Sequence, residues 1–272
     1  MTRARLVRGG SILAVLVTIA AAVAVTLTLT SGSAAGGHRG SAGAVPRPYT
    51  VRVMPLGDSI TWGEGSPTAS GYRRPLWDLV AGQSRYAVRF VGSLSNGDLP
   101  QPANEGHRGW RIGDVSAKVD GWLAVSRPDV VLLHLGINDL LRDTDVAHAP
   151  DRLAALIDRI YADRPGVSVV YMGLLPNTAR VRTEVAAFDR RAVALARTER
   201  QRGRPFWYVT PPTLTTAEMH DGVHPNDAGY RRIAGALFPA LGRAVADRID
   251  RRLPPAPTPT PPPAPRTAAT AG

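Results

Sequence analysis

A serine that directly follows a buried-strand pattern is the first candidate for chemistry in this sequence. The apolar run at 51–56 continues into Gly57, Asp58 and Ser59, which places Ser59 just beyond the carboxyl end of a predicted strand. Ligands bind at this edge of the sheet in open α/β folds, and Gly57 allows the backbone to turn sharply or to approach a partner closely. We therefore interpret Ser59 as a nucleophile; a helix N-cap is the alternative role for a serine in this place.

A serine hydroxyl is barely nucleophilic at neutral pH, so Ser59 needs a base. Near the other end of the chain, Asp221 and His224 are three residues apart in a turn-forming segment. That spacing can place a carboxylate beside an imidazole, where it selects the tautomer and stabilises the imidazolium. We predict that His224 is the base and that Asp221 orients it; the alternative is a solvated surface turn.

Two further positions could stabilise negative charge on a carbonyl oxygen. Asn138 follows the apolar run at 130–135, so it falls on the same sheet edge as Ser59, and its amide could donate to an oxyanion. Gly109, in the loop after the second predicted strand, could donate through its backbone N–H. The alternatives are an Asx turn or a helix cap at Asn138 and an ordinary turn at Gly109.

Short runs rich in Val and Leu alternate with longer amphipathic segments between these positions. The runs predict strands at 51–56, 88–91, 130–135, 167–174 and 206–209. The amphipathic segments predict helices at 72–83, 112–125, 151–163, 185–202 and 227–252. Buried strands alternating with helices indicate a parallel sheet covered on both faces, which is a three-layer α/β/α sandwich.

In chain order, the four polar segments resemble the sequence blocks of the SGNH hydrolase superfamily, which is named for Ser, Gly, Asn and His. The blocks here are Gly57-Asp58-Ser59, Gly109, Gly136-x-Asn138-Asp139 and Asp221-x-x-His224-Pro225. The resemblance implies a flavodoxin-like five-stranded parallel sheet and a serine esterase that needs no cofactor. It also implies that Ser59 attacks an ester carbonyl, that His224 accepts the proton, and that Asp221 orients His224. The oxyanion would be held by the N–H groups of Ser59 and Gly109 and by the Asn138 side chain.

Two more segments resemble the branch of that superfamily that contains carbohydrate esterase family 3, to which acetylxylan esterases belong. They are Glu105-Gly106-His107-x-Gly109-Trp110 and Gly71-Tyr72-Arg73, although residue 108 is Arg where that branch would have Ser. An exported enzyme of this branch would remove short acyl groups, chiefly acetyl, from a carbohydrate or cell-wall polymer. The alternative is a lipase or acyl-ester hydrolase of the same fold that acts on lipids or other small esters. The candidate substrate-binding residues beside the predicted site are Trp62, Trp110 and Arg108.

Both ends of the chain differ from its middle. Residues 1–35 begin with three arginines and continue into an uncharged, mostly apolar run at 11–30, which predicts a signal peptide or a retained N-terminal membrane anchor. Either prediction places the hydrolase domain at 49–253 outside the cytoplasm, secreted or anchored to the outer face of the membrane. Residues 36–48 form a predicted flexible lead-in, and residues 254–272 a Pro/Thr/Ala-rich tail without a core.

Composition narrows the function classes further. The chain is 44% hydrophobic and 20% charged, which suits a globular domain, and its lack of cysteine excludes thiol nucleophiles. The formal charge of +11 is not accompanied by aromatic or groove-reading elements, so we expect no nucleic-acid partner. Attraction to an anionic cell wall or polysaccharide is a better use of this charge.

Two other classes of protein remain open on the residues alone. A metal-dependent deacetylase could bind Zn²⁺ through His220 and His224, which are four residues apart with Asp221 between them. Gly222 and Pro225 disfavour the regular helix that this spacing requires, and no third ligand stands out, so we expect no metal. A non-catalytic carbohydrate-binding module could stack sugars on its tryptophans, which are Trp62, Trp77, Trp110, Trp122 and Trp207.

Three other polar residues near the predicted site are expected to have structural roles. Asp58 is predicted to bind loop N–H groups, and His134, inside an apolar strand, to be a core histidine with its hydrogen bonds satisfied. Arg73 is predicted to be a surface arginine.

Overall fold

A parallel sheet forms the centre of the computed structural model, which describes residues 49–142 and 145–252. Its five predicted strands lie in the order β2-β1-β5-β6-β7, and all are parallel. This order and direction confirm the predicted α/β class. The bounds of these strands are β1 Tyr49–Gly57, β2 Tyr86–Phe90, β5 Val130–His134, β6 Ser168–Met172 and β7 Phe206–Val209.

Two short strands extend this sheet, so the predicted count of five is incomplete. Across the described residues the sheet has seven strands. β4, Ala103–Gly106, runs parallel to the carboxyl end of β1, and β3, Leu94–Ser95, pairs antiparallel to β4. β3 has two residues and β4 has four, and neither shows an alternation of apolar and polar residues, so the sequence gives no periodic signal for these strands. β4 continues the edge of β1 beyond the part that pairs with β2.

Helices follow most of the strands. The predicted helix at 112–125 is in fact two helices, separated at residues 117–118, and two short helices near Ser59 and Asn138 had no prediction. The helices are α1 Ser59–Trp62, α2 Arg73–Ala81, α3 Ile112–Ser116, α4 Val119–Ser126, α5 Ile137–Leu141, α6 Ala149–Asp163, α7 Arg182–Gln201 and α8 Asp227–Arg252. Three 3₁₀ turns accompany them: η1 Val146–His148, η2 Ala179–Val181 and η3 Thr216–Glu218.

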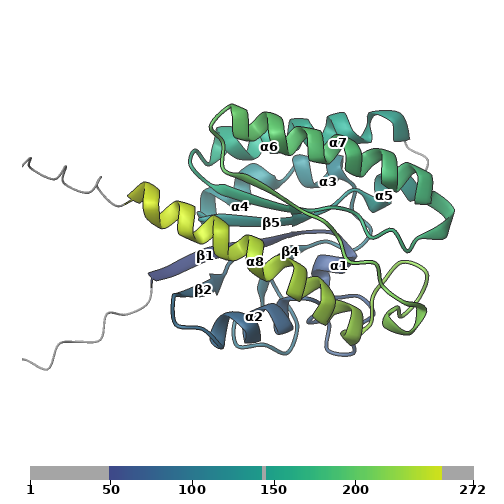
Figure 1. Ribbon diagram of the computed structural model, residues 1–272, viewed down its shortest axis with the longest axis horizontal. Helices are drawn as coiled ribbons and strands as arrows, with labels where there is room; N and C mark the ends of the chain where they lie inside the picture. The colour runs from purple at the N-terminus through teal and green to yellow at the C-terminus, as the bar shows by residue number, and fades with distance from the viewer. Residues whose placement is uncertain (1–48, 143–144, 253–272) are drawn as a thin grey trace, which may run out of the picture. The chain divides into compact units, whose positions relative to one another are not determined.

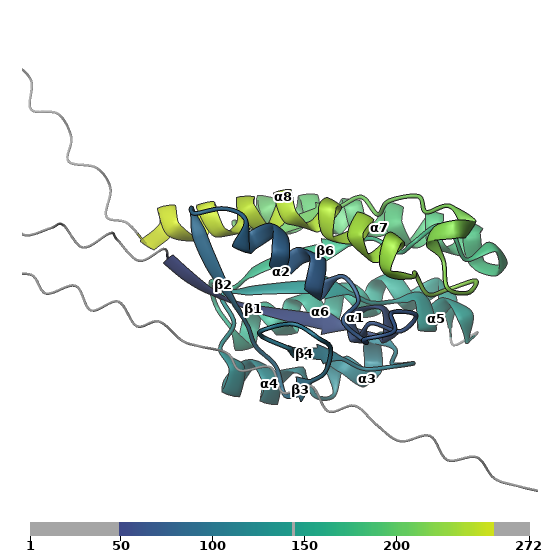
Figure 2. The same ribbon diagram turned by 90° about the horizontal axis from the view of Figure 1, so that it is seen from below.

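Alternate residues of each strand face different helix layers, which explains why both faces of the sheet are apolar. Val51 and Val53 of β1 pack in one core cluster with α2 and α8. Met54 and Leu56 pack in the other cluster with α3, α4, α6 and α7. Figure 1 shows α2 below the strands, α6 and α7 above them and α8 running diagonally across the view, and Figure 2 shows α2 beside α8 from a second direction.

The carboxyl ends of the central strands meet at one edge, where the predicted site lies. Gly57, the last residue of β1, is in register with Gly106 of β4 and His134 of β5. The segments that follow these strands therefore begin side by side.

No helix within residues 49–142 and 145–252 is long and apolar enough to cross a membrane. The apolar run at 11–30, the lead-in at 36–48 and the Pro-rich tail at 254–272 lie outside the described residues.

Candidate active site

Ser59 lies in the sharp turn between β1 and α1. The Asp58 side chain caps α1 by accepting a hydrogen bond from the Ile60 N–H at 3.0 Å, as predicted. Gly57 is needed for close approach, because a Cβ there would lie 2.0 Å from the His134 carbonyl oxygen. Ser59 is the first residue of α1, so its own N–H has no acceptor within the helix. The turn thus places the hydroxyl and the N–H of Ser59 beyond the carboxyl end of β1, outside the hydrogen bonding of the sheet.

A chain of hydrogen bonds joins Ser59 to the distant turn at 221–225. The distance from Ser59 Oγ to His224 Nε2 is 2.9 Å, and that from His224 Nδ1 to Asp221 Oδ2 is 2.8 Å. The second oxygen of Asp221 accepts the N–H groups of Val223 and His224, each at 2.7 Å. Partial burial would raise the pKa of Asp221, but these hydrogen bonds outweigh it and lower the pKa. The carboxylate is therefore ionised and oriented toward the imidazole.

Asn138 and the loop that contains Gly109 are in direct contact. Asn138, the second residue of α5 and 8% exposed, donates from Nδ2 to the Trp110 carbonyl oxygen at 3.0 Å. A primary amide has two N–H groups, so this bond leaves one of them for another acceptor. The same loop is fixed to the end of β1, because the His107 N–H donates to the Gly57 carbonyl oxygen at 2.9 Å. The loop thereby connects the Ser59 turn with Asn138.

A buried acid and a buried histidine lie beneath the Ser59 turn. His134 is 2% exposed, and its Nδ1 lies 3.9 Å from Asp58 Oδ1. Within the described residues, neither His134 ring nitrogen has a hydrogen-bond partner, so the prediction of a satisfied core histidine is wrong. Burial lowers the pKa of His134 to about 4 and raises the pKa of Asp58 to about 7. Both shifts disfavour the charged forms, as desolvation requires.

Arg73 is completely buried, so its prediction as a surface residue is also wrong. Its guanidinium donates only to backbone carbonyls, and it connects three segments around the Ser59 turn. The acceptors, at 2.7 to 3.0 Å, are the carbonyl oxygens of Thr61, Trp62, Ala69, Asn96 and Pro102. Burial lowers the pKa of Arg73 to about 10, which still leaves it protonated at neutral pH. Arg73 therefore holds the backbone that follows Ser59.

Glu64, which no sequence motif singles out, lies beside the imidazole. Its Oε2 is 3.6 Å from His224 Nε2, and its carboxylate forms an ion pair with Arg108. The Arg108 guanidinium lies over the Trp62 ring, 4.9 Å from its centroid. That ring face is covered, so Trp62 does not offer it to a substrate. An acid in a glycine-rich loop carries no sequence signal for such a position.

Trp110 is also stacked within the protein. The His107 ring stacks on both Trp110 and Trp122, with centroid distances of 4.1 and 4.7 Å, and the two tryptophan rings lie 6.0 Å from each other. His107 Nε2 lies 3.0 Å from the buried carboxylate of Glu105, which also accepts from Ser93. The Glu105 and His107 side chains are therefore engaged in building the loop that carries Gly109.

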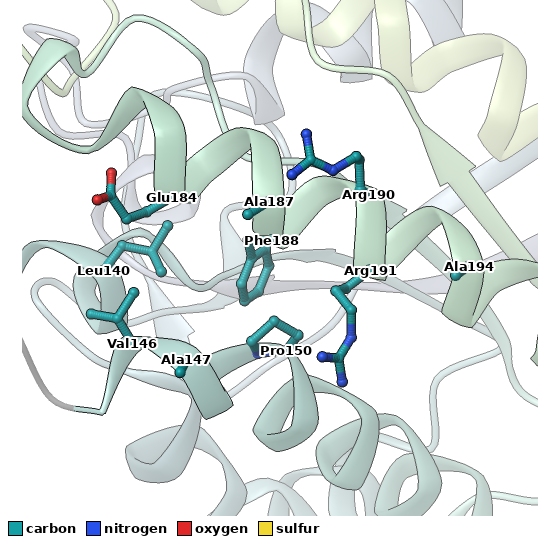
Figure 3. A pocket seen from close by; sticks show the side chains of 10 residues that line it. All are labelled: Leu140, Val146, Ala147, Pro150, Glu184, Ala187, Phe188, Arg190, Arg191 and Ala194. Atoms are coloured by element: carbon teal, nitrogen blue, oxygen red, sulfur yellow. The ribbon is translucent and has the colours of Figure 1, made fainter.

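The pocket in Figure 3 is separate from the Ser59–His224 pair. It has a volume of about 440 Å³, and Phe188 of α7 faces Pro150 of α6 across it. Leu140 of α5 lines one end, two residues beyond Asn138, but neither Ser59 nor His224 lines it. Among the described residues, no group of three or more His, Cys, Asp or Glu side chains is placed to hold a metal ion.

Comparison with known proteins agrees with this geometry. Residues 56–232 match the model of the GDSL-like lipase/acylhydrolase family. The chain belongs to this family. Together with the similarity to esterases described next, this match identifies the GDSL-family domain as a carboxylic ester hydrolase.

The GDSL-family domain is similar to both carbohydrate esterases and other esterases. A family 3 carbohydrate esterase from Clostridium thermocellum superposes with a TM-score of 0.67 and 27% identity, covering 73% of this chain and 99% of that one. Esterase TesA of Pseudomonas aeruginosa is 26% identical over 70% of this chain and 87% of its own length. A multidomain esterase of Ruminococcus flavefaciens is 22% identical over 68% of this chain, but the match spans only 27% of that protein.

Proposed function

We propose that this GDSL-family protein is an extracellular serine esterase that removes short acyl groups, chiefly acetyl, from a carbohydrate or cell-wall polymer. The observation that carries the proposal is the hydrogen-bonded series Ser59–His224–Asp221 at the carboxyl edge of the sheet. A nucleophile within reach of a base, which is itself oriented by a carboxylate, is the arrangement that serine hydrolases use.

In the first half of the reaction, Ser59 Oγ attacks the ester carbonyl carbon while His224 Nε2 takes the hydroxyl proton. Asp221 holds the Nδ1–H tautomer and stabilises the imidazolium that forms. The tetrahedral intermediate then collapses as Nε2–H protonates the alcohol oxygen, which leaves. The acyl group remains on Ser59 as an ester.

In the second half, His224 takes a proton from water, and the hydroxide attacks the acyl-serine. Collapse of the second intermediate returns the proton to Ser59 and releases the carboxylic acid. In both halves, the proposed oxyanion donors are the N–H groups of Ser59 and Gly109 and the second N–H of the Asn138 amide. Gly109 suits this role because no acceptor among the described residues binds its N–H.

Two observations support an acetylated carbohydrate as the substrate. The chain is similar over most of its domain to a family 3 carbohydrate esterase. In addition, the side chains beside His224 Nε2 include the Glu64–Arg108 ion pair, and an alkyl alcohol would desolvate this pair at a cost.

Hydrolysis of p-nitrophenyl acetate and p-nitrophenyl octanoate, with and without a serine-directed organophosphonate or EDTA, tests this function. We expect preference for acetate, loss of activity with the phosphonate and no effect of EDTA. Release of acetate from acetylated xylan would then test the polymer. A clear preference for octanoate would favour the lipase alternative, and activity that only EDTA removes would indicate a metal-dependent deacetylase.

The extracellular part of the proposal rests on residues 1–35. Expression of the full chain in a bacterial host, with fractionation of medium, membrane and cytoplasm, tests it. Recovery in the medium with a new N-terminus near residue 35 would support a cleaved signal, and an intact membrane-bound chain would support an anchor. Recovery of the intact chain in the cytoplasm would contradict export.

A further inference from the structure

Glu64 is placed on the side of His224 that faces the reacting atoms. Its Oε2 lies 3.6 Å from Nε2, the same nitrogen that is 2.9 Å from Ser59 Oγ. The Glu64 backbone is held there, because the Tyr230 hydroxyl donates to its carbonyl oxygen. The next residue, Gly65, packs so closely on the histidine turn that a Cβ would lie 2.4 Å from the Pro225 carbonyl oxygen.

Arg108 fixes the direction of the Glu64 carboxylate. Its Nε donates to Oε2 at 3.0 Å and its Nη2 donates to Oε1, which makes the pair bidentate. The hydrogen bonds from Arg108 lower the pKa of Glu64, so the carboxylate is ionised at neutral pH. Arg108 immediately precedes Gly109, so this pair connects the loop after Ser59 with the loop of the proposed oxyanion donor.

The pair retains free donors and acceptors. A carboxylate has about four lone-pair sites and a guanidinium has five N–H groups, and the bidentate pair uses only two of each. The side chains of Glu64 and Arg108 are 26% and 56% exposed, so a ligand can reach both. In the proposed mechanism Nε2–H protonates the leaving alcohol, so groups beside Nε2 face the alcohol part of the ester rather than the acyl part.

We infer that Glu64 and Arg108 form the alcohol-side wall of the site and select esters of polyhydroxylated alcohols, such as sugars. A sugar hydroxyl next to the ester donates to the Glu64 carboxylate, and another accepts from Arg108. A simple alkyl alcohol would displace the water that binds this ion pair and would offer no hydrogen bonds in its place. This inference rests on the proposed serine esterase function and adds to it the residues that select the leaving group.

Two acetyl esters that differ only in the alcohol test the inference: mono-acetylated methyl xyloside and propyl acetate. The full-length protein is compared with Glu64→Gln and Arg108→Gln, and Asp78→Asn in the exposed Arg74–Asp78 pair is the matched control. We expect the ratio of kcat/KM for the xyloside ester to kcat/KM for propyl acetate to fall about tenfold in both test variants. The ratio should stay within about twofold of the wild type in the control.

Binding provides a readout that does not depend on turnover. In a Ser59→Ala background, calorimetry with acetylated methyl xyloside should show binding about tenfold weaker after Glu64→Gln. Thermal unfolding identifies any variant that has lost its fold. If Glu64→Gln is unstable, Arg108→Gln replaces it in the binding measurement.

An unchanged ratio, or equal losses on both esters, would overturn the inference, because the pair would then play no part in choosing the alcohol. Failure of the proposed function looks different: the wild type would hydrolyse neither ester, or Ser59→Ala would remain active on both.

Discussion

Ser59 Oγ and His224 Nε2 lie 2.9 Å apart although 165 positions separate the two residues in the chain. The hydrogen bond depends on two independent turns, one after β1 and one before α8. Each turn is held by its own acid: Asp58 accepts from the Ile60 N–H, and Asp221 accepts from the Val223 and His224 N–H groups. The pair is therefore positioned before any substrate binds.

The first prediction concerns the nucleophile. Ser59→Ala should lower kcat for p-nitrophenyl acetate on the order of 10⁴-fold or more, because no other group in the proposed mechanism can form the acyl intermediate. Thermal unfolding should change by only about 2 °C, and Ser95→Ala at an exposed position is the control. Wild-type turnover by the variant would remove Ser59 from the mechanism.

Asp221→Asn should lower kcat by about 10²- to 10⁴-fold, because an amide N–H facing Nδ1 favours the wrong imidazole tautomer. The amide oxygen can still accept from the Val223 and His224 N–H groups, so the turn should remain folded. Steady-state kinetics measure the effect, and Asp98→Asn, which replaces an exposed acid, is the control. Equal activity of the two variants would show that Asp221 only stabilises the turn.

Asn138→Ala should lower kcat by about 10²- to 10³-fold with little change in KM, as for other oxyanion donors. Asn138→Asp should be at least as impaired, because a carboxylate cannot donate and adds negative charge. Asn177→Ala is the control, since that amide also donates to a loop carbonyl. An effect on KM alone would instead make Asn138 a substrate-binding residue.

Arg73→Lys should destabilise the protein by about 3 kcal/mol, because an ammonium group has three donors for the five carbonyl acceptors that the buried guanidinium binds. For a domain of this size the melting temperature should fall by roughly 10 °C. Arg74→Lys, the exposed neighbour, should change it by about 2 °C or less. Equal melting temperatures for both variants would contradict the structural role of Arg73.

The last prediction concerns pH and His134. Burial lowers the pKa of His134 from 6.5 to about 4, so between these values the unfolded chain binds a proton that the folded chain excludes. His134 therefore makes the wild type less stable as the pH falls through this range, by about 3 kcal/mol at most.

Urea unfolding of the wild type and of His134→Gln between pH 4 and 7 measures this contribution. The free energy of unfolding of the wild type minus that of the variant should rise with pH up to about 6.5. Asp58, whose pKa is raised to about 7, titrates in both proteins, so the comparison isolates the histidine. A difference that is constant with pH would show that His134 is not neutral in the folded state.

The sequence by itself determined the five parallel strands, the long helices, the positions of Ser59 and Asn138 just beyond the carboxyl ends of strands, and a turn that contains His224. The strands could be predicted from runs of Val and Leu, because a strand that is buried on both faces is apolar throughout. Ser59 and Asn138 could be predicted as candidate site residues because the carboxyl ends of parallel strands share one edge of the sheet. Residues that follow different strands must then lie near one another.

Only the tertiary structure decided the surroundings of that edge. Three features depend on which loops meet, and no local period encodes them: the burial of Arg73, the approach of Glu64 to His224, and the lack of a hydrogen-bond partner for His134 among residues 49–142 and 145–252. The sequence does not distinguish a buried arginine that binds carbonyl oxygens from an exposed arginine, because the acceptors are backbone groups that every residue carries. Which side chains lie beside His224 Nε2 is therefore decided by the packing of the loops.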